Sequence, residues 1–173
     1  MNPIYFVFLG LFVVCLIIRI GYEVLKKAGR VNPRSKSLFA FIFTAMCVLW
    51  ISWFSMCPID PFPISLPDAL RWISLSLVIL GVGLSIGALV QLKGLENVER
   101  LVTTGLFSRI RHPMYTGFLS WIVGWSMYYG ALTSFIFGVI AVGNILYWRR
   151  LEEGTLELQY GESYRVYRKN TWF

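Results

Sequence analysis

Five apolar segments, separated by polar connections, dominate the pattern of this chain. They cover residues 4–22, 38–56, 70–92, 113–129 and 131–148. A helix rises about 1.5 Å per residue and a hydrocarbon core is about 30 Å thick, so the last two segments only just span it. We therefore expect an all-α integral membrane protein with five transmembrane helices and a helical C-terminal tail (residues 149–173), all in a single domain (residues 1–173).

The composition agrees with a membrane protein. Hydrophobic residues make up 57% of the chain and charged residues 14%, whereas soluble domains have about 25% charged residues. The first apolar segment follows Met1 without a basic region or a small-residue cleavage site, so we expect a retained helix rather than a signal peptide. Three cysteines without paired or metal-ligand spacing and a single histidine argue against a zinc or iron site.

The distribution of basic residues predicts an orientation. Fourteen of the sixteen lysines and arginines lie in the loop after the first segment, the loop after the third segment, or the tail. With five spans these three regions fall on one side, and the positive-inside bias places the N-terminus outside and the C-terminus in the cytoplasm. This role accounts for the net charge of +7, so we expect membrane lipids and no nucleic acid as partners.

The connections carry their own signals. Four prolines within residues 57–68 exclude a helix there and predict a rigid, extended link. In the third segment, Gly83 and Gly87 have the small-xxx-small spacing that lets helices approach closely in a bilayer. Only Gly130 and its neighbours separate the fourth and fifth segments, which predicts a tight helical hairpin.

The polar chemistry is concentrated in residues 105–117, which hold the only histidine. His112-Pro113 opens the fourth apolar segment, and proline is favoured in the first turn of a helix because its missing N–H costs nothing there. His112 is then near the N-cap, and Gly117, one turn later, leaves room for a ligand or a neighbouring helix. The run Arg111-His112-Pro113 is also compatible with a simple membrane-entry cap.

Acidic residues at the expected membrane exit favour a functional site over a simple membrane-entry cap. Glu152 and Glu153 follow the last apolar segment almost directly, and topology alone does not demand acids there. Arg149 and Glu153 are four residues apart and share one helix face. A tail lying on the membrane as an amphipathic helix is the alternative. Arg19 and Glu23 have the same spacing, either as an interfacial ion pair or as the lining of a pocket.

Taken in order, these motifs resemble the isoprenylcysteine carboxyl methyltransferase family. They are Leu101-Val102-Thr103-Thr104-Gly105-Leu106-Phe107, Arg111-His112-Pro113-Met114-Tyr115-Thr116-Gly117, Glu152-Glu153, and Tyr160-Gly161-Glu162-x-Tyr164-x-x-Tyr167. The related phospholipid N-methyltransferases share the Arg-His-Pro-x-Tyr-x-Gly element. The resemblance covers about residues 70–171. It implies an integral membrane enzyme that binds S-adenosylmethionine at its cytoplasmic end without a Rossmann domain, and the chain has no G-x-G-x-x-G motif after a strand.

The resemblance also implies roles for individual residues. Those expected to approach the cofactor are Gln91, Arg100, Leu101, Val102, Phe107, His112, Pro113, Met114 and Tyr115. Glu153, or Glu152 as the one-residue alternative, would hold the cofactor's cationic part, and Arg149 would orient an anionic substrate carboxylate. Arg149 and Glu153 are thus the expected catalytic residues. Phe107 stands where the family often has tyrosine, which keeps stacking and removes a hydroxyl contact.

Two acceptor chemistries fit these residues. A carboxylate is ionised at neutral pH and needs no base, so O-methylation of a prenylcysteine-like carboxylate held by Arg149 is the leading interpretation. N-methylation of a phospholipid amine needs a base, for which His112 and Glu153 are the candidates. A non-enzymatic scaffold or small transporter is the alternative from another class, but a transporter more often has polar residues at mid-span. The sequence gives no oligomeric state.

Overall fold

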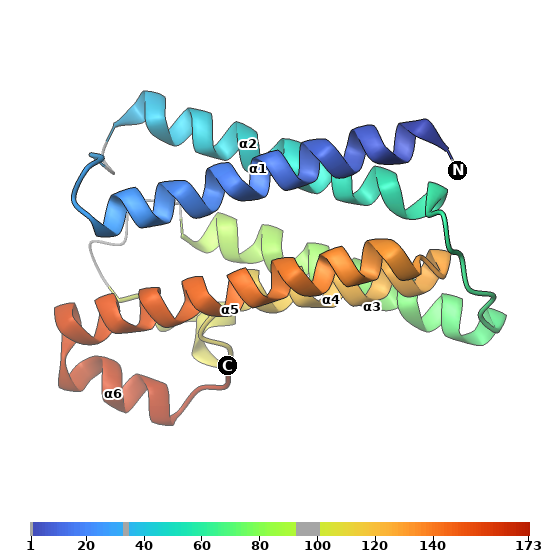
Figure 1. Ribbon diagram of the computed structural model, residues 1–173. Helices are drawn as coiled ribbons and strands as arrows, with labels where there is room; N and C mark the ends of the chain where they lie inside the picture. Colours follow the sequence, from blue (N-terminus) through green and yellow to red (C-terminus); the bar gives the residue numbers. More distant parts are fainter. Residues whose placement is uncertain (1, 33–34, 93–100) are drawn as a thin grey trace.

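A computed structural model describes residues 2–32, 35–92 and 101–173 as a bundle of helices (Figure 1). No strand forms within these ranges, and Pro63–Ala131 and Ile110–Trp172 are isolated bridges. The elements are α1 (Pro3–Lys27), α2 (Lys36–Met56), the 3₁₀ turn η1 (Cys57–Ile59), α3 (Asp68–Gln91), the 3₁₀ turn η2 (Gly105–Ser108), α4 (Pro113–Tyr129), α5 (Leu132–Tyr160) and α6 (Glu162–Lys169).

Four of the helices, α1, α2, α3 and α5, are long and apolar enough to cross a membrane. The helix α4 forms over the expected residues, but its 17 residues give about 26 Å, slightly less than a hydrocarbon core. An all-helical membrane protein with at least four candidate spans is therefore confirmed among the described residues. The fifth crossing stays a prediction.

The tail is not a separate element, because α5 continues twelve residues beyond the expected membrane exit at residue 148 and ends at Tyr160. Gly161 follows with φ of 51°, a left-handed value that favours glycine. The chain then turns back, and α6 lies beside the end of α5 (Figure 1). The residues after the apolar segment are thus carried on a rigid extension of α5.

Helices α3 and α4 pack most closely, and small residues make this possible. A Cβ atom on Gly81 would lie 2.6 Å from the carbonyl oxygen of Gly117, and one on Gly124 would lie 2.6 Å from that of Ser74. Gly117 therefore admits a neighbouring helix. Of the predicted pair, Gly83 has nothing within 4 Å of a Cβ position, whereas a Cβ on Gly87 would lie 2.8 Å from the Leu106 side chain. Gly81 and Ser85 have the same four-residue spacing of small residues as Gly83 and Gly87. Gly81 is the glycine of α3 that packs against the backbone of α4.

The two ends of the bundle differ in character. At one end lie the chain's N-terminus, the α2–α3 connection and the α4–α5 turn (Figure 1). There the Asp60 carboxylate accepts hydrogen bonds from the backbone N–H and the hydroxyl of Ser134, both at 2.6 Å, and so fastens the start of α5. Gly130, with φ of 63°, makes the predicted tight hairpin. The other end gathers the C-terminal part of α3, the start of α4, the end of α5 and α6.

The Arg19–Glu23 ion pair expected on the first segment is formed in the last two turns of α1. The Arg19 guanidinium also lies over the Trp148 ring, 4.4 Å from its centroid, where a cation is attracted to the ring face. The pair thus ties α1 to α5 at the end of the bundle that carries α6.

The α3–α4 contact makes a prediction about stability. Gly81→Ala should destabilise the protein by about 1–3 kcal/mol, because the new methyl group meets backbone that cannot move aside. Gly83→Ala is the matched control: it lies two residues away in open space and should be neutral or slightly stabilising through helix propensity. Thermal unfolding in detergent compares the two. Equal midpoints for both variants would contradict the packing described here.

Candidate functional site

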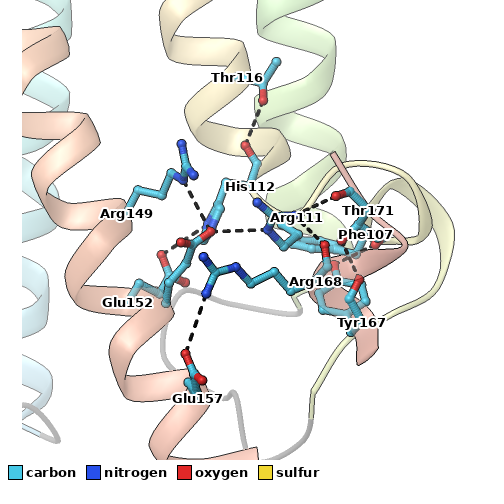
Figure 2. A network of polar contacts seen from close by, with 11 residues as sticks. Phe107, Arg111, His112, Thr116, Arg149, Glu152, Glu157, Tyr167, Arg168 and Thr171 are labelled. Carbon is cyan, nitrogen blue, oxygen red and sulfur yellow. Dashed lines mark hydrogen bonds and ion pairs between the residues drawn. The ribbon is translucent and has the colours of Figure 1, made fainter. Parts of the chain in front are cut away.

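The Glu153 carboxylate is the centre of a buried polar cluster at the α6 end of the bundle. Its Oε1 atom lies 3.3 Å from Arg111 Nε, 3.3 Å from His112 Nε2 and 3.4 Å from Arg149 Nε. Only 12% of the Glu153 side chain is exposed. Figure 2 shows Arg111 and His112, from the segment that leads into α4, meeting Arg149 of α5. All three of these contacts fall on one oxygen of the carboxylate.

Local structure places these side chains. Arg149 precedes Glu153 by one turn of α5, as the i, i+4 spacing predicted. His112 is the N-cap residue of α4, and Pro113 takes the first helical position, where its ring is buried. The His112 ring stacks on Tyr115, one turn into the helix, with ring centroids 5.4 Å apart. Pro113 and the stacked rings of His112 and Tyr115 therefore fix the direction in which the chain enters α4.

Arg111 connects three parts of the molecule. Besides Glu153, its guanidinium donates through Nη1 to the carbonyl oxygens of Arg168 at 3.0 Å and Thr171 at 2.6 Å (Figure 2). It is 10% exposed. Arg111 is part of the Arg-His-Pro motif, but sequence reasoning gave it no separate role, because nothing in the motif says that its partners come from the tail.

The last residues of the chain close over the cluster. The backbone N–H of Trp172 donates to the Arg109 carbonyl, and the Trp172 carbonyl accepts the backbone N–H of Arg111. These two hydrogen bonds form the isolated bridge between Ile110 and Trp172. Phe173 places its ring against the Arg149 guanidinium, 4.3 Å from the centroid. The last two residues of the chain therefore cover part of the Glu153 cluster.

The two adjacent glutamates face different surroundings. Glu152 Oε2 lies 3.6 Å from His112 Nδ1, and 46% of the Glu152 side chain is exposed. Glu153 is mostly buried and contacts the other ring nitrogen of His112. The imidazole is thus held between both carboxylates, and Glu153 is the one enclosed by cationic groups.

The imidazole is neutral at physiological pH. Burial lowers the pKa of His112 to about 4, because the charged ring would lose its hydration, and the nearby Glu153 carboxylate offsets this only in part. The Arg149 and Arg111 guanidinium groups lower this pKa further. A neutral ring donates one hydrogen bond, and its Nε2 atom, 3.3 Å from Glu153 Oε1, is the nitrogen within hydrogen-bonding distance of a carboxylate.

A second group of expected site residues lies at the C-terminal end of α3. Among the described residues, a cavity of about 260 Å³ is lined by Gln91, Leu101, Val102, Thr103 and Thr104. Gln91 Oε1 accepts the Leu106 N–H at 3.1 Å and so holds η2 onto α3. Gly105, with φ of 61°, lies directly under the Gln91 amide and has no room for a side chain. Arg100 lies outside the described residues.

The turn η2 links this cavity to the Glu153 cluster. Phe107 is buried, and its carbonyl accepts the Tyr167 hydroxyl at 2.7 Å. The Met114 carbonyl faces the Ser85 hydroxyl of α3 at 3.5 Å, so Met114 is tied to the α3–α4 contact. Of the expected residues, His112, Tyr115, Arg149, Glu152 and Glu153 share one cluster, whereas Gln91, Leu101 and Val102 share the cavity.

The comparison with known proteins fits this arrangement. A family model described as phospholipid methyltransferase matches residues 70–163, which is more than half of the chain. The chain belongs to the phospholipid methyltransferase family. Over 70 residues it is 36% identical to the protein-S-isoprenylcysteine O-methyltransferase of Schizosaccharomyces pombe. This segment makes up 40% of the chain but only 30% of the length of that protein. The resemblance drawn from the ordered motifs is confirmed.

The segment matched by the phospholipid methyltransferase family runs from α3 to the start of α6. It includes the cavity and the whole Glu153 cluster. Helices α1 and α2, and the residues from Tyr164 to Phe173, lie outside it. Arg168 and Thr171, whose carbonyl groups accept hydrogen bonds from Arg111, therefore belong to a part of the chain that the family match does not reach.

The low pKa of His112 makes a prediction about stability and pH. Between pH of about 4 and 6.5 the unfolded chain binds the proton and the folded protein does not. The stability contributed by His112 is thus full above pH 6.5 and is lost as the pH falls toward 4; its size is roughly 3 kcal/mol at most. His112→Gln should show a shallower loss over this window, measured by thermal unfolding in detergent. The same pH dependence in both proteins would contradict a neutral, buried imidazole.

Proposed function

We propose that this protein transfers a methyl group from S-adenosylmethionine to a lipophilic acceptor at the α6 end of the bundle. The observation that carries the proposal is the convergence of Arg111, His112 and Arg149 on a single Glu153 oxygen. Membership of the phospholipid methyltransferase family supports the reaction class. The S. pombe relative, by its name, is an O-methyltransferase that acts on protein-S-isoprenylcysteine.

The residues present fit the cofactor. Because the hydrogen bonds that Glu153 makes with the described residues all use Oε1, its Oε2 atom is available to a cationic group such as an α-ammonium. The cavity lined by Gln91, Leu101 and Val102 would take the adenosyl part, with Phe107 between the two regions. His112, Pro113, Met114 and Tyr115 would form the wall along the start of α4.

A carboxylate is the acceptor that this site favours. S-adenosylmethionine supplies an activated methyl group on a sulfonium, and in-line transfer requires alignment and exclusion of water more than acid–base help. Arg149, 24% exposed at the edge of the cluster, would orient the carboxylate with its guanidinium. A C–O bond forms as a C–S bond breaks, and no proton is moved. A buried imidazole with a pKa of about 4 suits this reaction, because no strong base is required.

N-methylation of a phospholipid headgroup is the second candidate, favoured by the description of the matched family. An ammonium acceptor must first lose a proton, and His112 and Glu153 are the groups placed to take it. The low pKa of His112 makes it a weak base, which is the reason for ranking this reaction second.

The membrane arrangement we propose has five spans, with α4 as the fourth, in one domain. The N-terminus lies outside, and the site and the C-terminus lie in the cytoplasm, in line with the basic residues collected at the α6 end. Large apolar side chains such as Trp72, Ile79 and Val90 are exposed on the bundle and would face lipid. The hydrophobic part of the acceptor would then enter sideways between helices.

Cofactor binding tests the site. Glu153→Gln should weaken binding of S-adenosylhomocysteine by about 10- to 100-fold, because a charge-assisted hydrogen bond is lost. Glu157→Gln is the control. Glu157 lies one turn after Glu153 on α5, and its ion pairs with described residues are those with Arg165 and Arg168 of α6. Calorimetry on purified, folded protein in detergent measures both affinities. Absence of binding by the unmodified protein would refute the proposed function.

Product analysis tests the acceptor. With an S-prenylated cysteine we expect incorporated methyl that base releases, as from an ester, and with phosphatidylethanolamine little or none. Arg149→Lys keeps the charge but loses the planar fork of donors, so it should raise KM for the carboxylate acceptor by roughly 10-fold or more. Base-stable methyl on the phospholipid, found by mass spectrometry, would instead establish the amine reaction.

A further inference from the structure

The Tyr164 hydroxyl is a buried polar group without a partner. Only 1% of Tyr164 is exposed, and its oxygen makes no hydrogen bond within the part of the chain that the structure describes. Leaving such a group unpaired is costly, so each case requires an explanation. Tyr167, three residues later on the same helix, is different, because its hydroxyl donates to the Phe107 carbonyl. The docking of α6 therefore needs the Tyr167 hydroxyl and does not use that of Tyr164.

Tyr164 lies on the helix that docks against the Glu153 cluster. One turn after it, the Arg168 carbonyl of α6 accepts a hydrogen bond from Arg111 Nη1 at 3.0 Å. Burial, together with the nearby Glu153 carboxylate, raises the pKa of Tyr164 to about 12. The hydroxyl thus keeps its proton at neutral pH and can donate a hydrogen bond. Arg111 also has donors to spare. Its hydrogen bonds to the described residues use Nε and Nη1, and a guanidinium carries two further N–H groups on Nη2.

We propose that the Tyr164 hydroxyl, together with Arg111, binds the carboxylate of the amino-acid part of the cofactor. This assignment rests on the proposed function, in which Glu153 holds the neighbouring ammonium group. An α-amino acid has its ammonium and carboxylate on adjacent carbons, so a site that binds both must present an acceptor and donors close together. Glu153 supplies the acceptor, and Tyr164 and Arg111 supply the donors. The three side chains come from α5, α6 and the segment before α4.

The proposal explains why an orphaned hydroxyl is kept in this position. A phenylalanine would fill the same space and would avoid the cost of burying an unpaired group. The hydroxyl is therefore unfavourable in the ligand-free protein and becomes favourable when a carboxylate arrives. It also gives α6 a part in binding, beyond that of a cover over the cluster.

The test compares Tyr164→Phe with the unmodified protein on two ligands. One is S-adenosylhomocysteine, and the other is its decarboxylated analogue, which keeps the amine and lacks the carboxylate. Tyr164→Phe should bind S-adenosylhomocysteine about 10- to 100-fold more weakly and the decarboxylated analogue with unchanged affinity, as measured by calorimetry. An unchanged affinity for S-adenosylhomocysteine, or the same loss for both ligands, would overturn the assignment.

Stability measurements separate this role from a structural one. Ligand-free Tyr164→Phe should unfold at the same temperature as the unmodified protein or higher, because no hydrogen bond is removed. Tyr167→Phe, the matched variant, should unfold at a lower temperature, because it loses the bond to Phe107. A large drop in the unfolding temperature of Tyr164→Phe would overturn the proposal. If the unmodified protein binds neither ligand, the proposed function fails instead, and the two failures are distinguishable.

Discussion

The pair formed by Arg111 and Glu153 determines how the functional end of the bundle is assembled. Both side chains are nearly buried, and a charge there must be paired or it destabilises the fold by several kcal/mol. Glu153 can be satisfied only if α5 continues beyond its apolar segment, if the chain before α4 reaches it, and if Arg111 stays in place. Arg111 in turn is satisfied by the carbonyl groups of Arg168 and Thr171. One buried carboxylate thus requires the docking of α5, the start of α4 and the tail.

The helix α5 is fastened by carboxylates at both ends of the bundle. Asp60 binds the N–H groups at its start, where the helix dipole favours a negative charge. Glu153 holds its extension. Between these points, lipid offers no hydrophobic force that would press helices together, so close packing of small residues does this instead. The contact of Gly81 with Gly117 sets the distance between α3 and α4, and thereby between the Gln91 cavity and the His112 ring.

Hydropathy was sufficient to predict the helices because crossing a bilayer constrains length and composition at once. It located α4 to the residue and the other starts within a few residues. It did not predict that α5 continues to Tyr160, because its last turns are polar and are held by tertiary contacts rather than by lipid. The spacing of small residues pointed to Gly83 and Gly87, and it could not say that Gly81 rather than Gly83 meets α4, because spacing alone does not identify the face that has a neighbour.

The pairing of Arg149 with Glu153 could be predicted from the sequence because it depends on helical spacing alone. The partners of Arg111 and the unpaired hydroxyl of Tyr164 could not, because they depend on how α6 docks. The same holds for Phe173, whose ring lies on Arg149. Local spacing therefore predicts contacts within one helix, and contacts between segments distant in sequence need the fold.

The charge balance of the cluster limits what it can bind. Two guanidinium groups and two carboxylates meet around an imidazole that is itself neutral. A ligand that brought a single net charge into this enclosed space would leave that charge without a counterpart, which is costly at low dielectric. The amino-acid part of a methyl donor is zwitterionic, so its ammonium and carboxylate together would leave the balance unchanged, and the positive charge of the sulfonium would be met by an acceptor carboxylate. The neutral histidine is part of this balance, because a third cation beside Arg111 and Arg149 would favour a purely anionic ligand over the amino-acid part of a methyl donor.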